Sequence, residues 1–222
     1  MSTKLRLNFT LAFAALAASL YAQAPKLVPL PVELPKPGQE GTPPNFNIAN
    51  LEKPSNKPRP PFLVPSDVTN VAKGKKVTSS EKDPLVGDLT MIVDGDTEQV
   101  EGNDVELGAG VQWVTIDLAA PQEIFGILFW HYFQPRVYYS VIVQTADDEA
   151  FKQNVQTWFN NDINNKAQQG AGKNLNYIES YEGKLVDTKG VKARYVRLFS
   201  AGSNANTLNH YVEVEVFGRP AK

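Results

Sequence analysis

The sequence predicts an all-β fold, either an antiparallel sandwich or a barrel, from three observations. Residues 112–118 (QWVTIDL) place Val114, Ile116 and Leu118 at every second position, which is the period of a half-buried strand. Residues 123–132 (EIFGILFWHY) are apolar on both faces, which predicts a central strand covered on both sides. No segment shows a long helical period, and turn residues separate the short strands.

Three further segments complete the expected set of strands. Residues 138–148 and 193–202 are rich in β-branched and aromatic residues and end in turn residues. Residues 210–218 (HYVEVEVFG) alternate again, which predicts Val212, Val214 and Val216 on one face. We expect these strands to form one domain covering residues 67–219.

Composition limits how this domain is held together and what it binds. The chain has 222 residues, 42% of them apolar, which is enough for the core of one ordinary domain. It has no cysteine, so core packing, with or without a metal ion, must hold the fold. The net charge is −2 and there is no basic stripe, which argues against a nucleic-acid partner.

Residues 1–22 have the order of a secretory signal peptide. Lys4 and Arg6 precede an apolar run, LAFAALAASLYA, and small residues follow it. This run is too short to span a bilayer as a stable helix, so we expect no membrane insertion after cleavage behind Ala22. The sequence therefore predicts export, with a periplasmic, cell-surface or extracellular location.

Residues 23–66 are predicted to be a disordered, proline-rich tether. Pro25 to Pro65 contains twelve of the sixteen prolines, which fix φ and remove amide donors, so we expect neither helix nor ladder there. The segment is interpreted either as a spacer or as a docking strap. The apolar side chains that favour a strap are Phe46, Ile48, Leu51, Phe62 and Leu63.

Five motifs in order give the domain a resemblance to a known family. NVAKGKKVTSS, VDGD, QWVTIDL, ARYVRLFS and VEVEVFG together resemble the discoidin domain, also called the coagulation factor V/VIII C-type domain. Bacterial sugar-binding modules with the galactose-binding-like jelly roll share this order. The resemblance covers residues 67–219 and implies an antiparallel β-sandwich jelly roll that binds without catalysis. The chain departs from the family in lacking its paired cysteines and in carrying an insert over residues 159–190.

The loop VDGDTEQVEGNDVE concentrates carboxylates, the ligands that calcium prefers. An EF-hand is excluded because Gln99 and Val105 stand where that loop requires Gly and Glu. The family resemblance instead implies a structural calcium ion bound by Asp94, Asp96 and Glu213, with main-chain carbonyls completing the shell. The alternative is a polar turn whose acidic side chains bind nothing.

The segment WHYFQPRVYY (130–139) is the densest cluster of aromatic and hydrogen-bonding residues. Sugar recognition needs a flat apolar face and a few fixed polar groups, which His131, Tyr132 and Arg136 offer. The resemblance implies that Arg136 contacts the sugar. Acidic residues replace the histidine that relatives often carry after VDGD, so galactose itself is not implied. The alternative is that this cluster packs the edge of the sandwich.

Two more residues complete the candidate ligand-binding set, Asn204 in the polar loop 200–209 and His210 after it. We expect His210 to form a hydrogen bond at the edge of the last strand, with a ligand contact as the second interpretation. A zinc site and a serine-nucleophile elbow both lack their required residues, so no enzyme is predicted. The predicted function is a noncatalytic carbohydrate-binding module. The alternative is an assembly subunit that binds an exported protein partner.

Overall fold

The computed structural model describes residues 26–36, 47–53, 55, 57–98, 100–132 and 136–221. In these ranges the regular elements are β-strands and one short 3-10 helix, η1 (Leu89–Val93). The expected signal peptide, residues 1–22, and Phe46 of the expected strap lie outside the described residues. Over the same ranges, no helix is long and apolar enough to cross a membrane.

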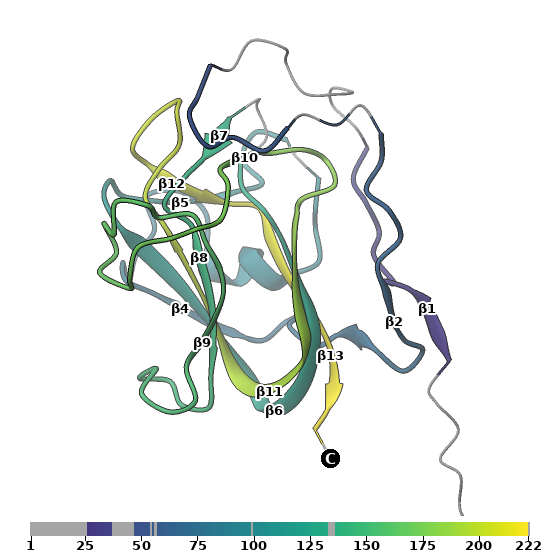
Figure 1. The fold of residues 1–222 in the computed structure, drawn as a ribbon. Coiled ribbons are helices and arrows are strands. Elements are labelled where there is room, and N and C mark those ends of the chain that lie inside the picture. Colours follow the sequence, from purple (N-terminus) through teal and green to yellow (C-terminus); the bar gives the residue numbers. More distant parts are fainter. Residues whose placement is uncertain are drawn as a thin grey trace, which may run out of the picture.

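Two long strands shape the domain. β6 (Gln112–Trp130) and β11 (Lys184–Ser200) pair antiparallel along most of their lengths. Their register shifts twice between Asp187 and Tyr195, and Figure 1 shows both strands curving together. The predicted strands 112–118 and 123–132 are therefore two halves of one bent strand, with Ala119 in a positive-φ conformation (69°) between them.

The other strands complete an antiparallel sandwich, as expected. The first half of β6 pairs with β4 and its second half pairs with β13. The strand order is β3-β13-β6-β11-β8-β9, and three two-stranded pairs flank it, β1 with β2, β5 with β12 and β7 with β10. The bounds are β1 (Leu27–Pro29), β2 (Leu63–Pro65), β3 (Thr69–Asn70), β4 (Lys76–Ser79), β5 (Val105–Leu107), β7 (Val137–Tyr138), β8 (Ile142–Ala146), β9 (Gln156–Asn160), β10 (Tyr177–Ile178), β12 (Asn209–Tyr211) and β13 (Glu213–Pro220).

The main core lies inside the sandwich, and the residues that form it follow the predicted alternation. Val114, Ile116 and Leu118 of β6 are fully buried in it, and so are Val214 and Val216 of β13. The placement of Val212 on that same face was wrong. Val212 lies in the break between β12 and β13, where its amide donates to the Trp130 carbonyl (2.9 Å), and it packs in a second cluster.

The second cluster covers the opposite face of β6 and explains why residues 123–132 are apolar at consecutive positions. Ile127 and Phe129 enter the main core, whereas Leu128 and Trp130 enter the second cluster. The prediction of a strand covered on both sides is confirmed. The covering residues include Leu30 and Val64 from the proline-rich segment, with Val32, Phe62, Val68 and Phe217. Burying each such side chain contributes about 1.5–3 kcal/mol.

The proline-rich segment is thus a strap, which we define as the described residues between 26 and 65. The prediction that it is disordered and makes no ladder was wrong for β1 and β2, which pair antiparallel beside the sandwich (Figure 1). The amide of Leu30 donates to the Phe62 carbonyl (2.8 Å), and that of Ser66 donates to the Lys26 carbonyl (2.9 Å). Proline at 29 and 65 falls between these bonded positions, where a strand residue turns its amide away from its partner.

Residues 50–59 of the strap are fastened to the segment that leads into β11. The amide of Glu52 donates to the Asn176 carbonyl (2.8 Å), and the Glu52 carboxylate forms an ion pair with Lys184. The amide of Arg59 donates to the Glu182 carboxylate (2.9 and 3.1 Å). The strap therefore crosses the insert over residues 159–190, which itself supplies the end of β9, all of β10 and the start of β11.

Candidate functional site

The candidate site lies where β6 ends and β7 begins. The chain leaves β6 at Trp130 and returns at Arg136, immediately before β7. The loop between β11 and β12 fixes the return point. The amide of Val137 donates to Asn204 Oδ1 (2.7 Å), and the amide of Asn204 donates to the Val137 carbonyl (3.1 Å). Asn204 thus positions the backbone next to Arg136.

Tyr132 lies between a guanidinium and an imidazole. The Cζ atom of Arg136 is 4.5 Å from the centre of the Tyr132 ring, within the range of a cation–π contact. The ring centres of Tyr132 and His210 are 5.3 Å apart. The structure therefore brings together three of the five predicted ligand-binding residues, and we refer to them as the Tyr132 site.

The buried guanidinium of Arg136 is only partly paired, because it interacts with the Tyr138 hydroxyl and lies over the Tyr132 ring. Arg136 is 9% exposed, and its Nε and Nη1 atoms have no acceptor among the described residues. An unsatisfied buried donor costs about 1–3 kcal/mol, and more when it is charged. Two directed donors therefore stand beside the face of Tyr132 without an acceptor.

His210 is held in place by the acidic loop. It is 5% exposed, and its Nδ1 atom lies 3.1 Å from Asp104 Oδ2 and 3.5 Å from Glu106 Oε2. The pairing of β12 with β5 sets Glu106 opposite His210. When Nδ1 donates to Asp104, Nε2 of the neutral ring is an acceptor, and Nε2 has no partner among the described residues. His210 thus forms the expected hydrogen bond, but in β12 beside β5 and not at the edge of the last strand, β13.

The role of Asp104 was missed in the sequence. The acidic loop suggested a metal site there rather than a partner for a histidine 106 residues away. The available signal was the pattern VEL, in which Val105 and Leu107 are buried and Glu106 lies between them. That pattern indicates a strand, but it does not identify β12 as the partner strand.

His131 does not belong to the binding surface, which corrects the prediction. It is fully buried, and its ring stacks on Tyr138 with the ring centres 4.3 Å apart. Its Nδ1 atom lies 3.0 Å from Tyr177 Oη and 3.3 Å from Glu179 Oε2. Neighbouring residues at a strand end point to opposite sides, so His131 enters the core while Tyr132 faces the site.

The predicted calcium residues lie close together only in part. The amide of Gly95 donates to Glu213 Oε2 (3.2 Å), so the VDGD turn does contact the terminal strand. Asp94 and Asp96 are exposed, and each accepts a backbone amide two residues ahead. Across the described ranges, no group of three acidic or histidine side chains is placed to hold a metal ion.

Glu213 nevertheless has the environment of a cation ligand. Its side chain is fully buried, and Oε1 has no partner among the described residues. Burial raises the pKa of Glu213 to about 9, and the nearby carboxylates of Glu215 and Asp94 add to the rise. Of the predicted calcium ligands, Glu213 is thus buried with one carboxylate oxygen unpartnered among the described residues, whereas Asp94 and Asp96 are exposed in the turn beside it.

Comparisons with known proteins identify the fold. No protein-family model matches the chain, and no curated protein matches it in sequence. Among solved structures, the lectin domain of lectinolysin in complex with Lewis B antigen is 22% identical, with a TM-score of 0.50, over 69% of this chain and 98% of that one. A family 89 glycoside hydrolase from Clostridium perfringens is 18% identical, with a TM-score of 0.50, over 68% of this chain but 15% of that one. The fold is the galactose-binding-like jelly roll expected from the sequence.

Proposed function

We propose that this chain is a noncatalytic carbohydrate-binding module, which takes a sugar at the Tyr132 site. The observation that carries the proposal is the set of unpartnered nitrogens around one aromatic ring. Arg136 supplies two donors, and His210 supplies Nε2. A sugar hydroxyl both donates and accepts hydrogen bonds, and the C–H face of a sugar ring packs on an aromatic face. The likeness in fold to a lectin domain supports the same class of ligand.

His210 is positioned by two carboxylates and one aromatic ring. Its ring contacts Asp104, Glu106 and Tyr132, and within the described part of the chain no serine, threonine or lysine bonds to it. Whether the module belongs to the discoidin family is part of this proposal, and its support is the order of the five motifs in residues 67–219.

We also propose that the module acts outside the cytoplasm. The support is the signal-peptide order of residues 1–22, from Lys4 and Arg6 to Ala22. An assembly role with an exported protein partner is the second candidate function. One observation favours it: Leu27 of β1 and Leu63 of β2, two strands that pair with each other, are 55% and 53% exposed.

A structural calcium ion remains a further proposal. Glu213 would hold it, together with the VDGD turn that contains Asp94 and Asp96 and already contacts Glu213 through Gly95. When bound, the ion would neutralise the negative charge of the buried Glu213 carboxylate. Its role would be to tie β13 to the loop after η1 in a chain without disulfides.

An array of neutral and acidic glycans tests the proposed function. The chain is applied with its strap intact, next to Arg136→Ala and a matched control, Arg197→Ala. Arg197 also stacks on an aromatic ring, that of Trp113 (4.4 Å), but it lies on the outer face of β11 away from the Tyr132 site. We expect binding that Arg136→Ala abolishes and Arg197→Ala retains. A folded chain that binds no glycan would favour the protein-partner role.

A further inference from the structure

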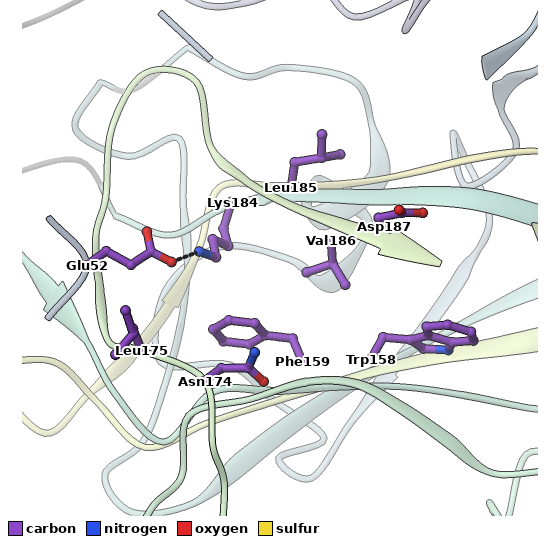
Figure 2. A pocket seen from close by; sticks show the side chains of 9 residues that line it. All are labelled: Glu52, Trp158, Phe159, Asn174, Leu175, Lys184, Leu185, Val186 and Asp187. Carbon is purple, nitrogen blue, oxygen red and sulfur yellow. Dashed lines mark hydrogen bonds and ion pairs between the residues drawn. The ribbon is translucent and has the colours of Figure 1, made fainter. Parts of the chain in front are cut away.

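A cleft lies on the side of the sandwich, and none of the three residues of the Tyr132 site lines it. It has a volume of about 340 Å³ and lies between β9 and the start of β11 (Figure 2). β9 is the last strand in the sheet order, and the first part of β11 pairs only with β6. The cleft therefore lies where the edge strand β9 faces the first part of β11, which has a partner strand on one side only.

Aromatic side chains form one wall of this cleft. Figure 2 shows Trp158 and Phe159 on one side and Lys184, Val186 and Asp187 on the other. The Trp158 indole is fixed because its Nε1 donates to Thr145 Oγ1 (2.9 Å). The Lys184 Nζ atom lies 5.1 Å from the centre of the Phe159 ring. The wall is therefore set in place before any ligand arrives.

Polar groups stand around the aromatic wall. Asn174 uses its Oδ1 to accept the amide of Asn160 (2.7 Å), and its side-chain NH2 makes no hydrogen bond within the described ranges. Asp187 pairs with Lys189, and its side chain remains 45% exposed. Glu52 of the strap closes one end of the cleft through its ion pair with Lys184 (Figure 2). The strap thus supplies one of the polar groups.

We propose that this side cleft is a second carbohydrate subsite, which binds one neutral sugar residue. Its ligand class rests on the proposed function, but its location does not. A volume of about 340 Å³ is at the lower end for sites of small ligands. Trp158 is partly exposed and offers the aromatic face, whereas Phe159 is buried; Asn174 and Asp187 add the amide and carboxylate groups that sugar hydroxyls require. Both carboxylates of the lining are already paired with lysines, Glu52 with Lys184 and Asp187 with Lys189, so no unpaired charge is left to select an acidic sugar.

A short segment of chain joins the two sites. The segment from Asn174 to Glu179 connects them, and the amide of Glu179 donates to the carbonyl of Arg136 (3.0 Å). Five residues span at most about 18 Å. Two weak contacts at that spacing on one glycan chain raise the overall affinity through effective concentration.

Fluorine NMR of the full chain labelled with 5-fluorotryptophan tests the side cleft. The chain has three tryptophans, so Trp113, Trp130 and Trp158 each give one signal. The probes are neutral oligosaccharides of glucose, galactose and N-acetylglucosamine, with an oligouronate as the charged comparison. We expect a neutral oligosaccharide to shift the Trp158 signal and to leave the buried Trp130 signal unchanged.

Two variants remove exposed polar side chains from the lining of the cleft. Asp187→Ala and Asn174→Ala are expected to weaken the Trp158 response about tenfold. Asp67→Ala is the matched control, because Asp67 is an exposed carboxylate that pairs with Arg219 outside the cleft, and it should change nothing. A Trp158 response that Asp187→Ala and Asn174→Ala leave intact would overturn the assignment.

The outcomes separate this inference from the proposed function. A Trp158 response that persists in Arg136→Ala supports a separate second subsite. Glycan binding that depends on Arg136 and leaves Trp158 unshifted would overturn the side cleft and uphold the Tyr132 site. A Trp158 response, together with glycan binding that Arg136→Ala leaves unchanged, would uphold the side cleft and overturn the Tyr132 site. An oligouronate that shifts Trp158 as strongly as the neutral sugars would overturn the preference for a neutral ligand.

Discussion

Arg136 lies over the ring of Tyr132, with its Cζ atom 4.5 Å from the ring centre, and two of its nitrogens have no acceptor among the described residues. This relationship is the basis of the proposed binding site. A guanidinium that is buried without a partner destabilises a fold unless something else accepts its hydrogen bonds. A sugar with several hydroxyl groups is such an acceptor.

The first prediction concerns the donors of Arg136. Replacing Arg136 with Ala removes hydrogen bonds to a charged group, each of which contributes about 1.5–3 kcal/mol. We expect the affinity for the array-selected glycan to fall by about 10- to 100-fold, as measured by titration calorimetry. The affinity of the Arg136→Lys variant should fall almost as far, because an ammonium group cannot reproduce the planar donors. Equal affinity in Arg136→Ala and the wild type would remove Arg136 from the site.

The second prediction separates the two histidines. His131 is in the core and His210 is at the Tyr132 site, so His131→Ala should lower the free energy of unfolding by about 2–4 kcal/mol. His210→Ala should weaken glycan binding several-fold, because it removes Nε2 from the site. Urea unfolding and calorimetry on both variants check this assignment. The reverse pattern, with His131→Ala stable and unable to bind, would contradict it.

The third prediction concerns the strap. Val64 is buried in the second cluster, whereas its neighbour Leu63 is 53% exposed. Val64→Ala removes about two methylene equivalents from the core and should cost about 2 kcal/mol of unfolding free energy. Leu63→Ala, the matched control, should cost almost nothing. If the two variants unfold at the same denaturant concentration as the wild type, the strap does not pack on the sandwich in solution.

The fourth prediction concerns calcium. If Glu213 and the VDGD turn bind the ion, adding calcium should raise the midpoint of thermal unfolding and excess chelator should reverse the rise. Glu213→Gln keeps the shape of the side chain but removes its charge, so it should abolish the calcium effect. An identical midpoint with calcium and with chelator would sink the calcium proposal.

The fifth prediction concerns acid. Arg194 donates two hydrogen bonds to Asp117 (2.7 and 2.8 Å), and these bonds hold the pKa of Asp117 below its usual value. The stabilisation is therefore complete above the unfolded pKa of about 3.9 and is lost as the pH falls through the lower, folded value. Asp117→Asn should be less stable than the wild type at pH 6, and the difference should shrink steadily as the pH falls below about 4. A difference that widens in acid would contradict this pairing.

The sandwich was predictable because its signals are local. Val114, Ile116 and Leu118 show the strand period within seven residues, and residues 123–132 show that both faces are covered. The sequence did not show what covers the second face. That cover comes from the strap, in which proline at 29 and 65 falls at positions that need no amide donor. The number of prolines alone suggested disorder, because the sequence does not show which positions of the paired strands they occupy.

The candidate site was predictable only in part, because its contacts join distant segments. Tyr132 and Arg136 are close in sequence, and the resemblance to sugar-binding modules selected them. The pairing of His210 with Asp104 depends on the alignment of β12 with β5, which no local pattern specifies. His131 was misplaced because the side to which a residue points depends on where the strand ends.

The most direct measurement follows the imidazole nitrogens of the two histidines by nitrogen-15 NMR during a glycan titration. The chain contains two histidines, so each signal is assigned by one variant, His131→Ala or His210→Ala. The proposed function predicts that glycan binding shifts the Nε2 signal of His210 and leaves the core His131 signals in place. Saturating glycan binding with the His210 signals unmoved would show that the sugar binds elsewhere.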